Sequence, residues 1–247
     1  MKKIFTLIAF LAVTIGAMAQ GQYFYEWKDG KYVQRSLAEV DSITFSLPES
    51  AEKAYKYVDL GLPSGTLWAD RNVGAASPEA YGDGFAWGET TTNSHNGFST
   101  YKWCKGSYDT LTKYNTKSHY GTVDNKTVLD LEDDAAYVNM GKEWRMPTYD
   151  ELYELRRKCT WIWIIQNGVC GYELTGPNGN SIFLPSSCDD SGHSGDCRGM
   201  GEYWSSSLTE ESPLYARNFN FSKFHYGFDI EYYYYRWYRK HVRAVLR

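Results

Sequence analysis

The sequence lacks any long apolar run beyond the one at its N-terminus. That run, Ile4 to Ile15, is short for a membrane span, and no other stretch of the 247 residues approaches one. It follows Lys2-Lys3 and precedes Ala17-Met18-Ala19, which is the order of basic, apolar and small residues in a secretory signal peptide. We therefore expect residues 1–19 to be a signal peptide cleaved after Ala19, and the mature chain to have no transmembrane segment.

The sequence also lacks a cysteine directly after this cleavage site and an excess of basic residues. Without that cysteine a bacterial lipoprotein is not indicated, so we expect Sec export to the periplasm, the cell surface or the medium. The chain has 26 basic residues against 30 acidic ones, and loss of Lys2 and Lys3 leaves 24 against 30. A mature net charge near −6 argues against nucleic acid as a partner.

Cysteine is scarce, with five residues: Cys104, Cys159, Cys170, Cys188 and Cys197. Export permits disulfides, and an odd number leaves at least one cysteine unpaired. Cys188 and Cys197 bracket a polar loop that a disulfide between them would close. A metal site formed by His193 and the loop aspartates is the alternative, but the spacing fits no zinc motif. We favour the disulfide and expect no metal and no other cofactor.

The groupings of residues that hydrolases and glycosidases use are missing. Gly192-His193-Ser194-Gly195 does not form the hydrolase elbow, in which glycine stands two residues to either side of the serine. The dyads Asp133-Asp134 and Asp189-Asp190 have no evident partner acid, and we interpret them as solvated carboxylates of a helix start and a loop. We therefore expect no catalytic residue.

The chain divides into a small module and a large domain. Two segments, Tyr23–Lys28 and Lys31–Arg35, flank Asp29-Gly30, which is a strong signal for a hairpin with a two-residue turn. We expect a signal peptide at 1–19, a β-hairpin module at 20–47, a linker at 48–56 and one domain at 57–247.

One helix of the large domain is marked clearly. Thr148 can cap it while Glu151 reaches back to the amide of Thr148, and Leu152, Leu155 and Cys159 then share one face. We expect a second, shorter helix between residues 130 and 139, long loops between 91 and 130, and strands at 161–165, 168–174 and 181–184.

The last stretch, residues 203–247, combines alternating segments with an irregular one. Phe219 and Phe221 alternate with polar residues, as do Val242, Ala244 and Leu246, which indicates half-buried strands. From 222 to 241 no single period separates apolar from polar residues, so some of the many rings there must face solvent. Exposed amphipathic rings are typical of binding surfaces. The alternative is that these rings fill a β-rich core.

Basic residues are also concentrated in this last stretch. From Lys223 to Arg247 there are six basic residues against two acidic ones. Such an excess beside exposed rings would suit an acidic partner, and internal pairing with carboxylates is the alternative.

Several ordered segments resemble the Fibrobacter succinogenes major paralogous domain family. The resemblance runs from about Tyr57 to the end of the chain and rests on Leu60 to Ala69, Asn72 to Ala75, Phe85 to Thr90, Trp144-Arg145-Met146-Pro147-Thr148, Ser181 to Pro185, Tyr203 to Ser207 and Val242-Arg243. It implies an α+β, C-type-lectin-like fold related to formylglycine-generating enzymes, with two helices, a small twisted antiparallel sheet and termini that lie close together. Those enzymes bind copper through a late cysteine pair, and no cysteine follows Cys197 here.

The tail also resembles the variable region of proteins diversified by retroelements, which implies a changeable binding surface. Animal C-type lectins bind calcium through triplets that do not occur here, so binding is expected to be calcium-independent. The ligand is expected to be a protein or a glycan, and a cell-surface or fimbria-like assembly component is the alternative. The expected ligand-binding residues are Tyr215, His225, Tyr226, Asp229, Glu231, Tyr232, Tyr233, Tyr234, Tyr235, Trp237 and Tyr238.

Overall fold

The computed structural model describes the chain in two compact units, Met1–Glu52 and Lys53–Arg247. In the first unit it describes the backbone of β1 (Tyr23–Lys28) and β2 (Lys31–Ser36), which pair antiparallel. In the second unit it describes residues 55–92, 97–186, 199–223 and 233–246. The expected signal peptide lies outside the described residues, and the division between the units falls inside the expected linker. None of the described helices has the length and apolar character that crossing a bilayer requires.

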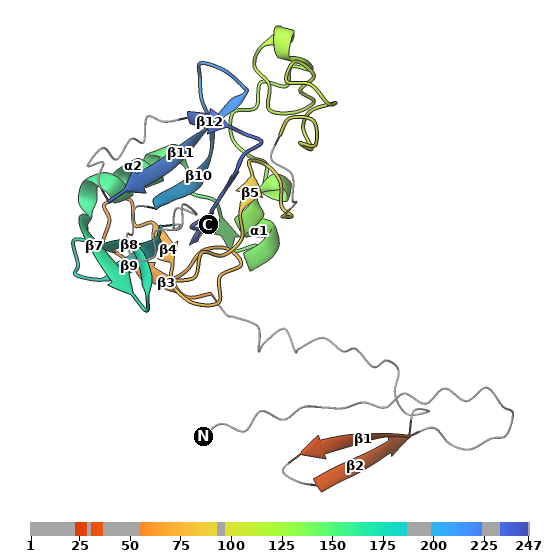
Figure 1. The fold of residues 1–247 in the computed structure, drawn as a ribbon, viewed down its shortest axis with the longest axis vertical. Coiled ribbons are helices and arrows are strands. Elements are labelled where there is room, and N and C mark those ends of the chain that lie inside the picture. Colours follow the sequence, from red (N-terminus) through yellow and green to blue (C-terminus); the bar gives the residue numbers. More distant parts are fainter. Residues whose placement is uncertain are drawn as a thin grey trace, which may run out of the picture. The chain divides into compact units, whose positions relative to one another are not determined.

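The described part of the second unit is a mixed α+β structure of small antiparallel sheets and two α-helices (Figure 1). Its sheets have the strand orders β3-β4-β14-β6, β10-β11-β12, β7-β8-β9 and β13-β5. The strands are β3 (Tyr57–Asp59), β4 (Leu67–Ala69), β5 (Phe85–Ala86), β6 (Trp144–Arg145), β7 (Thr160–Gln166), β8 (Val169–Thr175), β9 (Ser181–Pro185), β10 (Met200–Leu208), β11 (Tyr215–Ser222), β12 (Tyr233–Tyr235), β13 (Arg239–Lys240) and β14 (Val245–Leu246).

The first and last strands of this unit lie in the same sheet. Both β3 and β14 pair antiparallel with β4, so they run parallel to each other on its two sides. The resemblance to the C-type-lectin-like fold leads to the expectation of close termini, and this sheet agrees with it.

The helix that begins after Thr148 forms as the sequence predicts. In α2 (Tyr149–Lys158) the Thr148 hydroxyl accepts the N–H of Glu151, and the Glu151 carboxylate accepts the N–H of Thr148. This capping box satisfies backbone N–H groups that have no partner inside the helix. Leu152 and Leu155 are buried, so α2 presents the predicted apolar face to the core.

The shorter predicted helix is interrupted. A 3₁₀ turn, η3 (Leu131–Asp133), precedes α1 (Ala135–Met140), and Asp134 caps α1 by accepting the N–H groups of Ala136 and Tyr137. The residues between 97 and 130 are mostly loops, with a second 3₁₀ turn, η2 (Ser118–Tyr120).

The predicted alternation in the tail is confirmed at Phe219 and Phe221 but is wrong for the last segment, where residues 242–245 are all buried and Leu246 is only partly buried. Phe219 and Phe221 of β11 are buried and pack with Tyr203 and with the two leucines of α2, Leu152 and Leu155, in one core cluster. Val242 and Ala244 are buried in a second cluster around Trp87 and Trp204. Asn220, between the two phenylalanines, is only partly buried, so this part of β11 contacts the core through one face. Arg243 is buried and donates to Asn72, Ala69 and Phe183, so the last segment is enclosed on both faces.

One disulfide involves Cys170, to which the sequence analysis assigned no partner. Cys170 is disulfide-bonded, whereas Cys104 and Cys159 are free thiols. The partner of Cys170 therefore lies outside the described residues. The predicted pair, Cys188 with Cys197, lies outside them too.

Candidate functional site

The exposed rings gather around β12, the edge strand of the sheet β10-β11-β12. Tyr233, Tyr234 and Tyr235 form the strand, and Tyr238 follows in the next turn. All four are between 37 % and 43 % exposed, although each carries a large apolar ring. Together with half-buried Tyr215 of β11 they form what we call the tyrosine surface.

Ring contacts join the two strands across this surface. Tyr215 lies opposite Tyr235 in the β11–β12 register, with ring centroids 4.5 Å apart, and its ring is 5.0 Å from that of Tyr233. A hydrogen bond with Tyr235, together with burial, raises the pKa of Tyr215 to about 12. The rings therefore hold one another in place, and Tyr215 stays neutral at physiological pH.

The prediction that Trp237 is an exposed ligand-binding residue is wrong. It is only 8 % exposed and belongs to a core cluster with Tyr101, Leu111 and Leu214. Its ring stacks on Tyr235 at 4.5 Å and 19°, and Phe98 meets it edge-on at 5.8 Å. Trp237 supports the tyrosine surface from beneath and does not contribute an exposed anchor.

Tyr234 rests on a buried cation. The ammonium of Lys240 lies 4.0 Å from the centroid of its ring and forms an ion pair with Glu202. Tyr238 meets the same ring edge-on at 5.0 Å. Burial, opposed by Glu202, holds the pKa of Lys240 below its usual range. A ring held between a cation and a second ring has little freedom to move, which favours binding.

Five of the predicted site residues belong to a segment that the structure does not describe. His225, Tyr226, Asp229, Glu231 and Tyr232 all lie outside the described residues. Among the predicted residues that the structure describes, it brings together Tyr215, Tyr233, Tyr234, Tyr235 and Tyr238.

Arg236 is the residue that sequence reasoning missed. Its side chain is fully buried although it stands between two residues of the predicted surface. The guanidinium donates to the Tyr101 hydroxyl and to the backbone carbonyls of Tyr114, Pro213 and Lys113 at 2.8–2.9 Å. All four acceptors are neutral oxygens. Arg236 therefore holds β12 to the neighbouring loops through hydrogen bonds to neutral oxygens, without an ion pair.

The backbone of Arg236 is bonded as well. Its N–H donates to the Leu214 carbonyl, and its carbonyl accepts from the N–H of Trp87.

Burial of Arg236, Lys240 and Arg243 removes three of the six basic residues of the tail from the surface. This burial reduces the basic charge at the surface on which the hypothesis of an acidic partner rests.

Tyr114, whose carbonyl accepts from Arg236, is itself held by several hydrogen bonds. It is a buried residue with a positive φ of 58°, a conformation that costs about 1–3 kcal/mol for a non-glycine residue. The Asp124 carboxylate accepts its N–H, Arg236 donates to its carbonyl, and its hydroxyl donates to Asp133. These three hydrogen bonds stabilise the strained backbone conformation of Tyr114 and hold the loop that supports the tyrosine surface.

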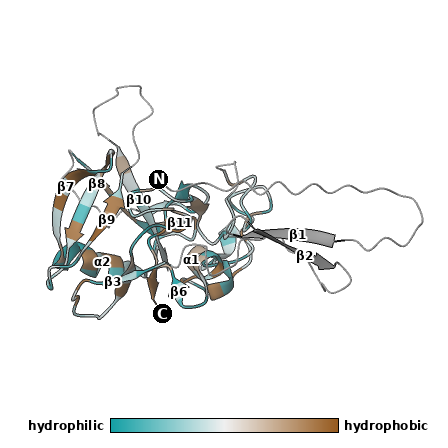
Figure 2. Cartoon of the chain, turned by 90° about the horizontal axis from the view of Figure 1, so that it is seen from below, coloured by the Kyte–Doolittle hydropathy of each residue, from teal (hydrophilic) through white to brown (hydrophobic). Residues whose placement is uncertain are grey.

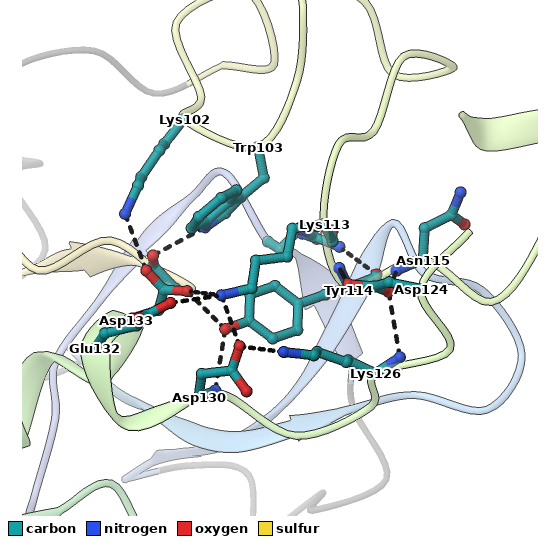
Figure 3. A network of polar contacts seen from close by, with 12 residues as sticks. Lys102, Trp103, Lys113, Tyr114, Asn115, Asp124, Lys126, Asp130, Glu132 and Asp133 are labelled. Atoms are coloured by element: carbon teal, nitrogen blue, oxygen red, sulfur yellow. Dashed lines mark hydrogen bonds and ion pairs between the residues drawn. The ribbon is translucent and has the colours of Figure 1, made fainter. Parts of the chain in front are cut away.

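Lys113, the residue before Tyr114, belongs to the network of charged side chains shown in Figure 3. The Lys113 ammonium lies 2.6 Å from carboxylate oxygens of Asp130 and Asp133 and 3.3 Å from one of Glu132. Lys102 reaches the other Asp133 oxygen at 2.9 Å. Asp133 and Asp134 are both buried, so the expectation that this dyad is solvated is wrong: one carboxylate pairs with lysines and the other caps α1.

Asp130, Glu132 and Asp133 are the candidate metal ligands among the described residues. Their carboxylate oxygens lie within 4.8 Å of one another. The Lys113 ammonium contacts all three, while Lys102 pairs with Asp133 and Lys126 pairs with Asp130, so three cations of the chain itself balance the three carboxylates. We assign the cluster a structural role.

The Asp133 pair makes stability sensitive to acid. Burial opposes ionisation of Asp133, but hydrogen bonds from Lys113, Tyr114 and Lys102 outweigh it and hold the pKa below its usual range. A lowered pKa in the folded state stabilises the protein above about pH 4 and loses that contribution as the pH falls further. We expect Asp133→Asn to cost about 2 kcal/mol at neutral pH and to flatten the acid limb of a stability profile from urea denaturation.

Glu132→Gln is the matched control for that variant. Glu132 contacts the same lysine but its side chain is 78 % exposed, so the variant should keep the wild-type acid limb. An acid limb unchanged in Asp133→Asn would contradict the assignment.

Comparison with known proteins adds no relative. No family model, curated protein or solved structure matches the chain.

Proposed function

We propose that the protein is an exported, non-catalytic binding protein that presents the tyrosine surface to a protein or glycan ligand. The observation that carries the proposal is the combination of four exposed tyrosines with a buried support. Tyr235 rests on Trp237, Tyr234 rests on Lys240, and Arg236 anchors the segment between them. Rigid aromatic side chains over a fixed base lose little entropy when a ligand binds.

The scaffold we propose is a C-type-lectin-like domain. Two α-helices, small antiparallel sheets and a sheet that contains both the first and the last strand support this assignment. The resemblance to retroelement-diversified proteins supports a surface whose residues are exchangeable. Asp133, Asp134 and Glu202 each have a structural partner, which favours binding over catalysis.

The test is capture of ligand by variants of the surface. We expect Tyr233→Ala/Tyr235→Ala/Tyr238→Ala to weaken capture from a glycan array or a displayed peptide library by more than about tenfold. The same variant should lose less than about 1 kcal/mol of stability per substitution, because these side chains are exposed. The readouts are array intensity and urea denaturation of the same preparations.

Exposed tyrosines elsewhere provide the control. Tyr57 and Tyr153 are 58 % and 44 % exposed on β3 and α2, so Tyr57→Ala/Tyr153→Ala should leave capture unchanged. Equal loss of capture in both sets, or unfolding of the first set, would contradict the proposal.

An assembly component is the second candidate, because a surface of exposed rings also suits contact between subunits. Sedimentation separates the two. Large open assemblies that disappear in the Tyr233→Ala/Tyr235→Ala/Tyr238→Ala variant would assign the surface to subunit contact.

A further inference from the structure

A second surface, unrelated to the tyrosine surface, lies along β7. This strand has the sequence TWIWIIQ, with no charge and no proline, and pairs with β8 in an unbroken register. The sheet order is β7-β8-β9, so β8 is the only strand beside β7 in the described part of the chain. No other described strand pairs with the second edge of β7, which we call its open edge.

The side chains of β7 are unusually exposed for their type. Ile162 is 52 % exposed and Ile165 is 65 % exposed, the largest value among the exposed large apolar residues described. Figure 2 shows β7 with brown, hydrophobic segments at the margin of this unit. Natural proteins usually protect an edge strand with lysine, proline or a bulge, and β7 has none of these.

The turn after β7 determines which backbone groups point outward. Asn167 and Gly168 have positive φ angles of 49° and 84° and connect the strands as a two-residue hairpin. In such a hairpin the flanking pair, Gln166 with Val169, is hydrogen-bonded, and bonded pairs then alternate along the strand. Ile164 therefore directs its N–H and C=O toward β8, whereas Trp163 and Ile165 direct theirs away from it.

We propose that the open edge of β7 pairs antiparallel with β7 of a second copy of this chain. A two-fold axis beside Ile164 places Trp163 of each copy opposite Ile165 of the other. Each of these pairs exchanges both backbone hydrogen bonds, and the two sheets become one continuous sheet across the axis. The two Ile164 residues then face each other as a close pair without backbone bonds.

The chemistry of β7 favours a second copy as the occupant. When a strand pairs antiparallel with the identical strand of a second copy, charged residues of one sign often lie opposite one another, which destabilises the pair. The seven uncharged residues of β7 avoid this, in a chain where 23 % of residues are charged. A two-fold contact also closes on itself, so it covers the edge without growing into a fibre.

The test is the mass of the purified protein in sedimentation velocity over a dilution series. We expect the wild type to sediment as a dimer that dissociates on dilution. Ile164→Lys and Ile164→Glu should each weaken association by more than about tenfold, because like charges then face each other across the axis. An equimolar mixture of the two variants should restore the dimer, since lysine then faces glutamate.

Ser181→Lys is the matched control. It places the same charge at an exposed residue of β9, the opposite edge strand of the same sheet, and should leave the dimer intact. A monomeric wild type, or a dimer that persists in Ile164→Lys, would overturn the proposal. Restoration by the mixture also shows that both variants are folded.

Discussion

Replacing Arg236 by methionine is expected to lower the free energy of unfolding by about 4 kcal/mol. Methionine fills part of the volume but donates no hydrogen bond. The Tyr101 hydroxyl and the carbonyls of Lys113, Tyr114 and Pro213 would each lose the donor that Arg236 supplies. A buried acceptor without a donor costs about 1–3 kcal/mol, and partial relaxation keeps the total below the simple sum. Urea denaturation followed by tryptophan fluorescence measures the change.

Two further variants separate geometry from charge at this position. Arg236→Lys keeps the charge but replaces the planar fork by a compact ammonium, so it should recover less than half of the loss. Arg157→Met removes an exposed arginine of α2 and should change stability by about 0.5 kcal/mol or less. A loss below about 1 kcal/mol in Arg236→Met would show that Arg236 does not anchor β12.

Trp237→Ala is expected to cost about 3 kcal/mol and to lower Tm by roughly 6–12 °C. The indole is almost fully buried, stacks on Tyr235 and meets Phe98 edge-on. Its removal leaves a cavity under Tyr235, and any loss of ligand capture would then follow from the displaced tyrosine. Thermal denaturation followed by near-UV circular dichroism measures the change.

Tyr234→Ala is the companion variant. It lies three residues away and is also a large aromatic residue, but it is 40 % exposed. It should shift Tm by no more than about 2–4 °C. Similar shifts in the two variants would mean that burial does not distinguish Trp237 from the tyrosines.

Much of the second unit follows from local patterns in the sequence. The capping box of Thr148 and Glu151 predicts the start of α2, because it needs only residues within one turn. Alternation predicts the inward faces of Phe219 and Phe221, because a strand must bury one side. Such features depend on neighbours along the chain, which a sequence displays directly.

The support of the tyrosine surface depends on distant residues and is not readable in this way. Arg236 bonds to residues more than a hundred positions earlier, and Asp133 is buried because Lys102 and Lys113 reach it from separate loops. The segment from 233 to 240 has a three-residue strand followed by a turn, which is too short for a period. Aperiodicity indicates that some rings face outward, and only long-range packing selects Trp237 as the ring that does not.

The sheet that holds both ends of the second unit has a mechanical consequence. Because β3 and β14 run parallel on the two sides of β4, tension between the ends pulls these strands in opposite directions along their axes. Hydrogen bonds perpendicular to the strands then resist the load together instead of opening one by one. Since β12 belongs to a different sheet, the load between the ends does not pass through the hydrogen bonds that hold the tyrosine strand.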